Sequence, residues 1–296
     1  MLTKRFLISG LMTGLLAALA ALAAPAARAD FITAGTAELV TARSCSVMGA
    51  SGCDVVSPIL YSQYGGTAGA PQSSANLNVA GYGTAIGSVA LSGVVGAPVL
   101  KASASGDVGA RTNTNSVALQ RYTYTGATTT TRTFGGDLTY SQSVTGSYPS
   151  DVGVGVNAEL EIFTLSDSAI SIGPSAEENF DMLFTQYVTL PGYVSLGLGS
   201  YSDDADAAAG SGTASVTVTL TPGESIWVRA LLQTPGTNGG WVDASHTFVT
   251  GWDDATSLVA AEVSAVPVIG TPWLVGIGLL AMVGVRRRSR NADTTR

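Results

Sequence analysis

Alternating apolar and polar positions run through most of the chain in short stretches that end at glycine-rich breaks. Apolar residues fall on every second position of the stretch 152–162, and the stretches 116–126 and 214–233 show the same period. A period of two places one side chain in the core and the next in solvent, as in a half-buried antiparallel strand. Several such strands at roughly ten-residue spacing predict an all-β body, either an antiparallel β-sandwich or a jelly-roll.

Turn and cap signals divide this pattern. The sequence Thr-Pro-Gly-Glu at 221–224 lies between two alternating runs and predicts a β-hairpin turn. Residues 174–183 predict one or two helical turns, with Ser175 as the N-cap and acidic residues in the first turn. Residues 61–83 are rich in Gly, Ser, Ala and Asn, which is typical of either a long loop or weak edge strands.

The N-terminal segment has the three parts of a secretory signal peptide. Two basic residues, Lys4 and Arg5, precede an apolar run over 6–24, and Ala27 and Ala29 then form a small-residue cleavage site. This arrangement predicts a signal peptide over 1–29, cleavage before Asp30 and export of the mature chain. The alternative is an uncleaved N-terminal anchor.

The C-terminal segment, 263–296, pairs an apolar stretch with a basic tail. A short transmembrane helix is expected over about 271–285, with Trp273 at the membrane interface. Its 14 uncharged residues, 272–285, cover about 21 Å, which is short of a hydrocarbon core of about 30 Å. The basic tail is 286–296, and the positive-inside rule places its arginines in the cytoplasm and the 30–262 domain outside. These arginines are Arg286, Arg287, Arg288 and Arg290.

A short motif, an apolar helix and a terminal basic cluster together resemble the PEP-CTERM sorting signal. The motif here is Val266-Pro267-Val268-Ile269-Gly270, where that family usually has Val-Pro-Glu-Pro-Gly. The resemblance implies recognition by an exosortase-type processing enzyme in the inner membrane of a Gram-negative bacterium that produces exopolysaccharide. It also implies cleavage near the motif and transfer to the cell surface or extracellular matrix. A permanent tail anchor is the alternative.

Charge excludes one class of partner. Between Asp30 and Val266 the chain has six basic and 20 acidic side chains, a net charge of −14. A body of this charge cannot neutralise phosphates, so nucleic acid is excluded as a partner.

The two cysteines, Cys45 and Cys53, predict a structural disulfide. They form a closely spaced even pair in a chain expected to enter an oxidising compartment, and the glycines and serine between them suit a turn.

Candidate catalytic and metal-binding residues are few. His246 is the only histidine, and a catalytic triad would require it with Asp243 or Asp253, but no G-x-S-x-G motif accompanies it. Glu159 and Glu161 share a strand face. They could be a catalytic pair of carboxylates across a sugar cleft, but alternation on an exposed strand face places two acidic residues in the same way. Three aspartates are weak calcium candidates because hard cations take carboxylate ligands, although their spacing is not that of an EF-hand. They are Asp203, Asp204 and Asp206.

Two sets of side chains on shared strand faces suggest either an aromatic platform for carbohydrate or ordinary core packing. The first set is Tyr122 with Tyr124, and the second is Trp227 with Arg229 and Leu231.

The sequence thus predicts a non-enzymatic exported surface or matrix protein associated with exopolysaccharide or biofilm and containing no cofactor. A carbohydrate-binding or calcium-dependent adhesion module is the alternative, and a hydrolase acting on matrix sugars is a third hypothesis.

Overall fold

The computed structural model describes residues 30–49, 52–56, 61–66, 70–93, 95–143, 153–173, 175–204 and 209–262. All of them belong to one of two compact units, Met1–Ser264, and the other unit is Ala265–Arg296. The predicted signal peptide, sorting motif, C-terminal helix and basic tail lie outside the described residues, so those expectations stay predictions. Within the described ranges, no helix is both long enough and apolar enough to cross a membrane.

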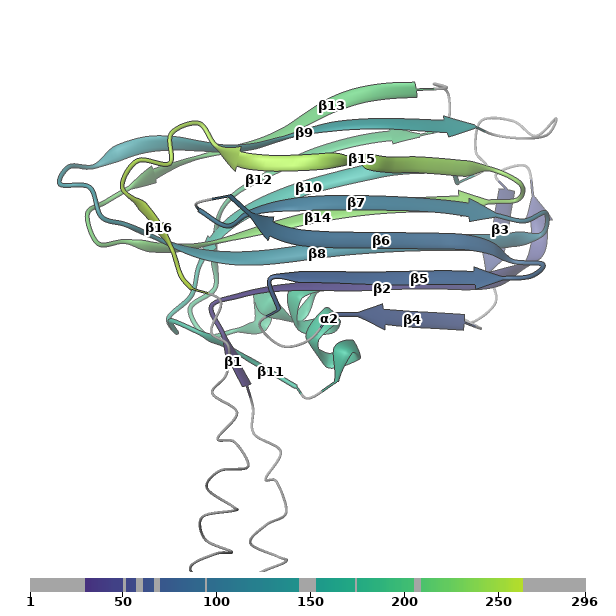
Figure 1. Ribbon diagram of the computed structural model, residues 1–296, viewed down its shortest axis with the longest axis horizontal. Helices are drawn as coiled ribbons and strands as arrows, with labels where there is room; N and C mark the ends of the chain where they lie inside the picture. Colours follow the sequence, from purple (N-terminus) through teal and green to yellow (C-terminus); the bar gives the residue numbers. More distant parts are fainter. Residues whose placement is uncertain are drawn as a thin grey trace, which may run out of the picture. The chain divides into compact units, whose positions relative to one another are not determined.

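Two stacked antiparallel sheets form a β-sandwich, which confirms the prediction of an all-β antiparallel sandwich (Figure 1). The six-stranded sheet has the order β13 (Ala209–Leu220), β9 (Thr130–Ser143), β15 (Trp241–Trp252), β7 (Ala97–Gly106), β6 (Gly83–Ser92) and β5 (Gln72–Val79). The eight-stranded sheet has the order β12 (Val194–Asp204), β10 (Gly155–Thr164), β14 (Ser225–Thr237), β8 (Ala110–Tyr124), β2 (Ala34–Gly49) and β3 (Gly52–Val56). Its remaining strands are β16 (Leu258–Ala260), paired with β8, and β4 (Tyr61–Gly65), paired with β2.

Smaller elements cover part of the outer face of the eight-stranded sheet. They are the two-stranded sheet of β1 (Asp30–Ile32) and β11 (Ile170–Ile172), the helix α2 (Ala176–Phe184) and the 3-10 helix η1 (Gln186–Thr189). The α2 helix contacts β2, β4 and β8 of this sheet. It begins at a capping box, because the Ser175 hydroxyl accepts from the Glu178 N–H and the Glu178 carboxylate accepts from the Ser175 N–H. This confirms Ser175 as the predicted N-cap.

The main core lies between the two sheets. Inward-facing side chains on alternating positions of both sheets form it, as the period of two predicts. Tyr122 and Tyr124 belong to this core and are 0% and 4% exposed. The suggestion that they form an exposed platform is therefore wrong, and core packing explains them.

A second apolar cluster lies under α2 and η1, on the outer face of the eight-stranded sheet. Trp227 and Leu231 of β14 pack there with Phe163, Phe180 and Tyr187. The shared face predicted for Trp227, Arg229 and Leu231 is confirmed, but these side chains are buried and cannot form an exposed platform.

The remaining local predictions have clear outcomes. The 221–224 turn joins β13 to β14, with the Glu224 N–H donating to the Thr221 carbonyl at 3.0 Å and Gly223 at φ +83°. A positive φ at the third turn position favours glycine, as in a type II turn. Residues 61–83 contain β4 and β5 at sheet edges, so the edge-strand interpretation is correct. Cys45 is not a free thiol, while the Cys53 side chain lies outside the described residues, so their pairing stays a prediction.

Candidate functional site

The carboxylates of Glu159 and Glu161 do not face a cleft. Glu159 pairs with Arg229 at 2.6 Å. Tyr187 donates to Glu161 at 2.5 Å, and Tyr193 donates to its other carboxylate oxygen. Burial raises the pKa of Tyr187 well above its usual range, so its hydroxyl stays a donor. These contacts make Glu159 and Glu161 part of the packing beneath the helices, and a role across a sugar cleft is not supported.

The weak calcium candidates do not form a site within the described part of the chain. Asp203 accepts a hydrogen bond from Tyr140, whose hydroxyl also lies 3.0 Å from that of Tyr201. The side chains of Asp204, Asp206 and His246 lie outside the described residues. Among the residues that the structure describes, no three His, Cys, Asp or Glu side chains are grouped as a metal site would require. Calcium binding therefore remains an untested expectation.

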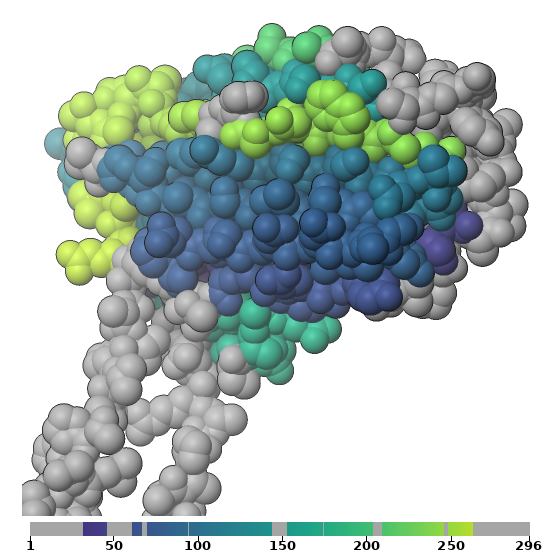
Figure 2. Space-filling model, turned by 45° about the vertical axis from the view of Figure 1, so that its right-hand side comes forward, coloured from purple at the N-terminus to yellow at the C-terminus, as the bar shows by residue number. Residues whose placement is uncertain are grey.

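The outer face of the six-stranded sheet is open to solvent over several strands. In β13 every second residue is exposed, and from Ala214 onward the residues between them are buried. The first residues of β5 alternate in the same way. The described helices pack on the eight-stranded sheet instead. Figure 2 shows the blue residues of β5, β6 and β7 and the yellow-green residues of β15 spread over this face. We refer to it as the open face.

A shallow groove of about 460 Å³ crosses the open face at β13, β9 and β15. Its floor is a row of small residues, because Gly135 of β9 pairs with Gly251 of β15 and with Ser215 of β13. A Cβ added at Gly251 would meet no atom within 4 Å, and one at Gly135 would make only ordinary contacts. Both glycines therefore leave space above the sheet that a side chain would fill.

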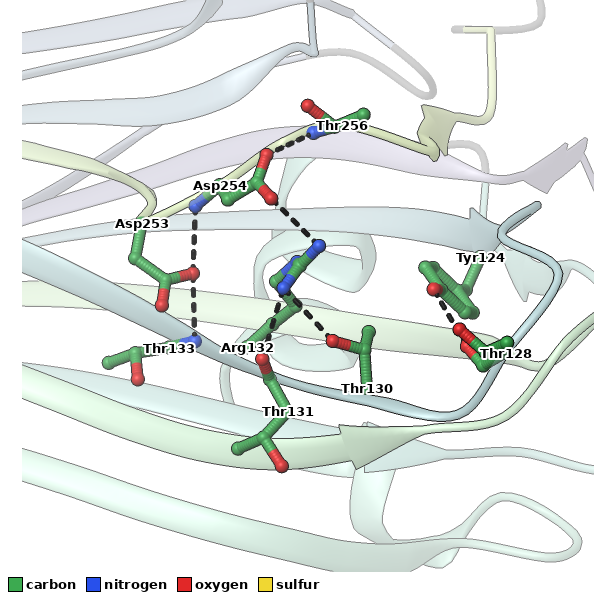
Figure 3. Close-up of polar contacts among 9 residues, drawn as sticks. All are labelled: Tyr124, Thr128, Thr130, Thr131, Arg132, Thr133, Asp253, Asp254 and Thr256. Carbon is green, nitrogen blue, oxygen red and sulfur yellow. Dashed lines mark hydrogen bonds and ion pairs between the residues drawn. The ribbon is translucent and has the colours of Figure 1, made fainter.

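The walls of the groove are rows of polar and apolar side chains on either side of this floor. Asp137 of β9 pairs with Val249 of β15 and with Thr213 of β13 on one side. Thr133 lies on the other side with Asp253, whose carboxylate accepts from the Thr133 backbone N–H at 3.0 Å (Figure 3). The groove therefore offers hydroxyls, two carboxylates and an exposed valine around a floor of peptide backbone.

Hydrogen bonds fix the turn that carries Asp253. The Asp253 carboxylate also accepts from the Asp254 N–H at 2.8 Å, and Asp254 pairs with Arg132 at 2.7 Å (Figure 3). Hydrogen bonds from Thr256, and then the Arg132 guanidinium, hold the pKa of Asp254 below its usual range. This end of the groove is therefore preorganised and does not depend on a ligand for its shape.

Asp137 and Asp253 lie at separate positions along the groove. Asp253 lies next to Thr133, which is four residues from Asp137 along β9. Four residues of strand span about 13 Å, whereas hydrolytic carboxyl pairs lie about 5 to 9.5 Å apart.

A second hollow of about 540 Å³ lies further along the open face, toward β5. Gln72 and Ser74 of β5, Ser88 of β6, and Lys101 of β7 are among its lining residues. These residues are again mostly short and polar. The open face therefore presents hydroxyl and amide groups over several strands, and the groove and this hollow are two depressions in it.

No protein-family model matches this chain, and no curated protein does. One similar solved structure is the enzymatically active domain of tailspike protein 4 of bacteriophage CBA120, at 8% identity and a TM-score of 0.25 over 62% of this chain and 20% of that one. Another is TmCBM61 in complex with β-1,4-galactotriose, also at 8% identity and a TM-score of 0.25, over 63% of this chain and 90% of that one. Likeness at this level carries no argument about function.

The groove was not predicted from the sequence, although a signal for it exists. Gly135 and Gly251 are glycines inside alternating strands, and such positions often mark a place where a ligand or another backbone approaches closely. The chain has 36 glycines, and only the pairing of β9 with β15 shows which two share a row.

Proposed function

We propose that this chain is a non-enzymatic exported surface or matrix protein that contacts exopolysaccharide through its open face. The observation that carries this proposal is the glycine-floored groove on the one broad sheet face that no described helix covers. A sugar ring has hydroxyl edges and C–H faces. Hydroxyls of Thr133, Thr213 and Ser215 with the carboxylate of Asp253 match the edges, and Val249 matches a face.

The proposal includes export and sorting by the two ends of the chain. The signal peptide over 1–29 would direct export, and the segment 263–296 would engage an exosortase-type enzyme in the inner membrane of a Gram-negative bacterium. The mature protein would then remain at the cell surface or in the matrix, where a polysaccharide ligand is abundant. A folded sandwich with a net charge of −14 suits that environment, because a high net charge keeps a protein soluble.

Intact-mass analysis of envelope and culture-medium fractions tests the sorting part of the proposal. We expect a species that begins at Asp30 and ends near Val266, because both processing sites would be used. A species that begins at Asp30 and keeps Arg286 to Arg290 would identify a permanent anchor and contradict sorting.

The substitution Gly251→Val tests the glycan-binding part. The Cβ of a valine there would meet no atom within 4 Å, the γ-methyl groups would occupy the groove floor, and a β-branched residue suits a strand. We expect binding to neutral polysaccharides, measured by affinity electrophoresis in gels containing dextran, xyloglucan or mixed-linkage β-glucan, to weaken by about tenfold, or about 1.4 kcal/mol. We expect the free energy of unfolding to stay within about 1 kcal/mol of the wild type or to rise, because glycine weakens a strand.

Ser200→Val is the matched control, since Ser200 is an exposed strand residue of the other sheet. It should leave retardation unchanged. Two outcomes would overturn glycan contact at the groove. Either none of the three polysaccharides slows migration of the wild type, or each slows the wild type and Gly251→Val equally.

A further inference from the structure

Arg43 and Arg111 form an unusual pair on the eight-stranded sheet. They are direct cross-strand partners, Arg43 on β2 and Arg111 on β8. Directly opposed residues of antiparallel strands have Cβ atoms about 5 Å apart, and like charges in this position are destabilising. Both side chains are half-buried, and the Nε atom of each is buried without a hydrogen-bond partner. The fold therefore keeps two positive charges together at an energetic cost.

The other described arginines all have partners. Arg132 pairs with Asp254, Arg229 with Glu159, and Arg121 donates to the Ser225 hydroxyl at 3.0 Å. Within the described part of the chain, no carboxylate pairs with Arg43 or Arg111. This is notable in a body with a net charge of −14, where acidic side chains outnumber basic ones by 20 to six.

Each arginine adds to the electrostatic strain of the other. Burial, and then the charge of Arg43, lower the pKa of Arg111 from its usual value. Arginine stays protonated in proteins, so the pair keeps two positive charges. An anion between the two guanidinium groups would relieve this repulsion, and each planar fork can donate two parallel hydrogen bonds to a carboxylate.

A row of amide side chains lies on the same face of the sheet. Asn157 of β10 donates to Gln233 of β14 at 3.1 Å, and Gln233 donates to Asn115 of β8 at 2.6 Å. Three neighbouring strands span about 10 Å, and Asn115 is about 13 Å along β8 from Arg111. Asn115 is buried, but Asn157, Gln233 and the arginine pair are half-buried polar side chains beyond the apolar part of this face that α2 covers.

We propose that Arg43 and Arg111 bind the carboxylate of a uronic-acid unit in an acidic polysaccharide, with Asn157 and Gln233, which are half-buried, contacting hydroxyls of the neighbouring units. This site lies on the sheet opposite the open face, and it rests on the proposed function for its class of ligand. It would let one chain contact polysaccharide on two sides and so link strands of a matrix.

Two polymers that differ only in charge test this site. The purified full-length chain is titrated by calorimetry with polygalacturonate and with carboxyl-reduced polygalacturonate. The titrations are made at 0.15 M salt, which screens the repulsion between the acidic body and the acidic polymer. Under these conditions we expect the wild type to bind the acidic polymer more tightly than the reduced one, because the arginine pair is a local positive site. Arg111→Gln should weaken binding of the acidic polymer by about tenfold and leave binding of the reduced polymer unchanged, because it removes one charged fork.

Arg121→Gln is the matched control, because Arg121 lies on the same strand, carries the same charge and already has a partner. It should change neither titration. Arg111→Lys keeps the charge without the fork and should give an intermediate loss. Unchanged thermal unfolding of the variants shows that each is folded, and equal losses from Arg111→Gln and Arg121→Gln would overturn the site.

The outcomes separate this site from the groove. A chain that binds neutral polysaccharide but shows no preference for the acidic polymer overturns the arginine site and leaves the proposed function standing. Binding of galacturonate monomer to Arg43 and Arg111 would be seen as shifts of the arginine Nε–H resonances. If the chain shows these shifts but binds no neutral polysaccharide, the result supports the arginine site and contradicts glycan contact at the groove. Binding of none of these probes overturns both.

Discussion

Glu38→Gln is expected to remove a fall in stability of about 4 kcal/mol that the wild-type chain undergoes between pH 5 and pH 8. Glu38 lies on β2, faces the space between the two sheets and is 0% exposed. Neither of its carboxyl oxygens has a hydrogen-bond partner among the described residues. The free energy of unfolding, measured by urea denaturation of both proteins at several pH values, checks this expectation.

The position of Glu38 explains the size of the effect. A Cβ added at Gly87 of β6 would lie 2.1 Å from the Glu38 carboxyl, so the carboxyl occupies the space that this glycine leaves. Burial raises the pKa of Glu38 to about 9. Glu38 is therefore neutral in the folded chain at pH 7.

The direction with pH follows from this raised pKa. Between the ordinary value of 4.5 and about 9, the folded chain keeps the Glu38 proton and the unfolded chain loses it. Unfolding then releases a proton, so stability falls as pH rises, by about 1.4 kcal/mol per pH unit. Glutamine is close in shape to a neutral glutamate and does not titrate, so the variant lacks this loss.

Glu262→Gln is the control for Glu38→Gln, because Glu262 is exposed. The difference between each variant and the wild type is compared from pH 5 to pH 8, so that titration of all other groups cancels. A constant difference for Glu38→Gln would show that its carboxyl ionises alike in the folded and unfolded chains and would contradict this account.

Arg229→Ala is expected to lower the free energy of unfolding by about 3 to 5 kcal/mol, the usual cost of breaking a buried ion pair on one side. The Arg229 side chain is 4% exposed and pairs with Glu159 at 2.6 Å. It also donates to the carbonyls of Leu183 and Phe184 at the end of α2, at 3.2 and 3.1 Å. Its removal leaves these groups without a partner.

Two further contacts add to the effect of Arg229. Its guanidinium lies 5.1 Å from the ring centre of Tyr187 and 5.8 Å from that of Phe184. These are cation–π distances, and both rings belong to the helical cover of the sheet. We therefore expect Arg229→Ala to loosen α2 and η1 as well, seen as faster hydrogen exchange over 176–189.

Arg132→Ala is the matched control for Arg229→Ala, because Arg132 also forms an ion pair, in this case with Asp254. The Arg132 and Asp254 side chains are 18% and 46% exposed, and such surface pairs contribute about 0 to 1 kcal/mol. Equal losses of stability from the two variants, measured by urea denaturation, would show that burial does not set the strength of the Arg229 pair.

The sequence predicts the local elements of this fold well, because they depend on neighbouring residues. Ser175 and Glu178 form a capping box three residues apart, and Thr221 to Glu224 contain a complete turn. The period of two likewise identifies β8, β10, β13 and β14. This period does not show which face of a strand packs against the other sheet, because α2 also buries part of the opposite face. Tyr122 and Trp227 are therefore both buried, on opposite faces of one sheet.

The groove, the arginine pair and the buried Glu38 could not be predicted in this way. Each depends on residues that strand pairing or sheet stacking brings together from distant parts of the chain. Gly135 and Gly251 are joined by β9 and β15, and Arg43 and Arg111 by β2 and β8. Glu38 alternates as a solvent-facing residue would, and only the stacking of β6 on β2 shows that it is buried.

The central claim, that the open face contacts glycan, is tested most directly by hydrogen exchange of the full-length chain with and without the neutral polysaccharide that retards it most. The account predicts slower exchange over 131–137, 213–217 and 249–254, which carry the groove, and unchanged exchange over 176–189, which covers the other sheet. Protection confined to 176–189, or to neither region, would contradict the claim.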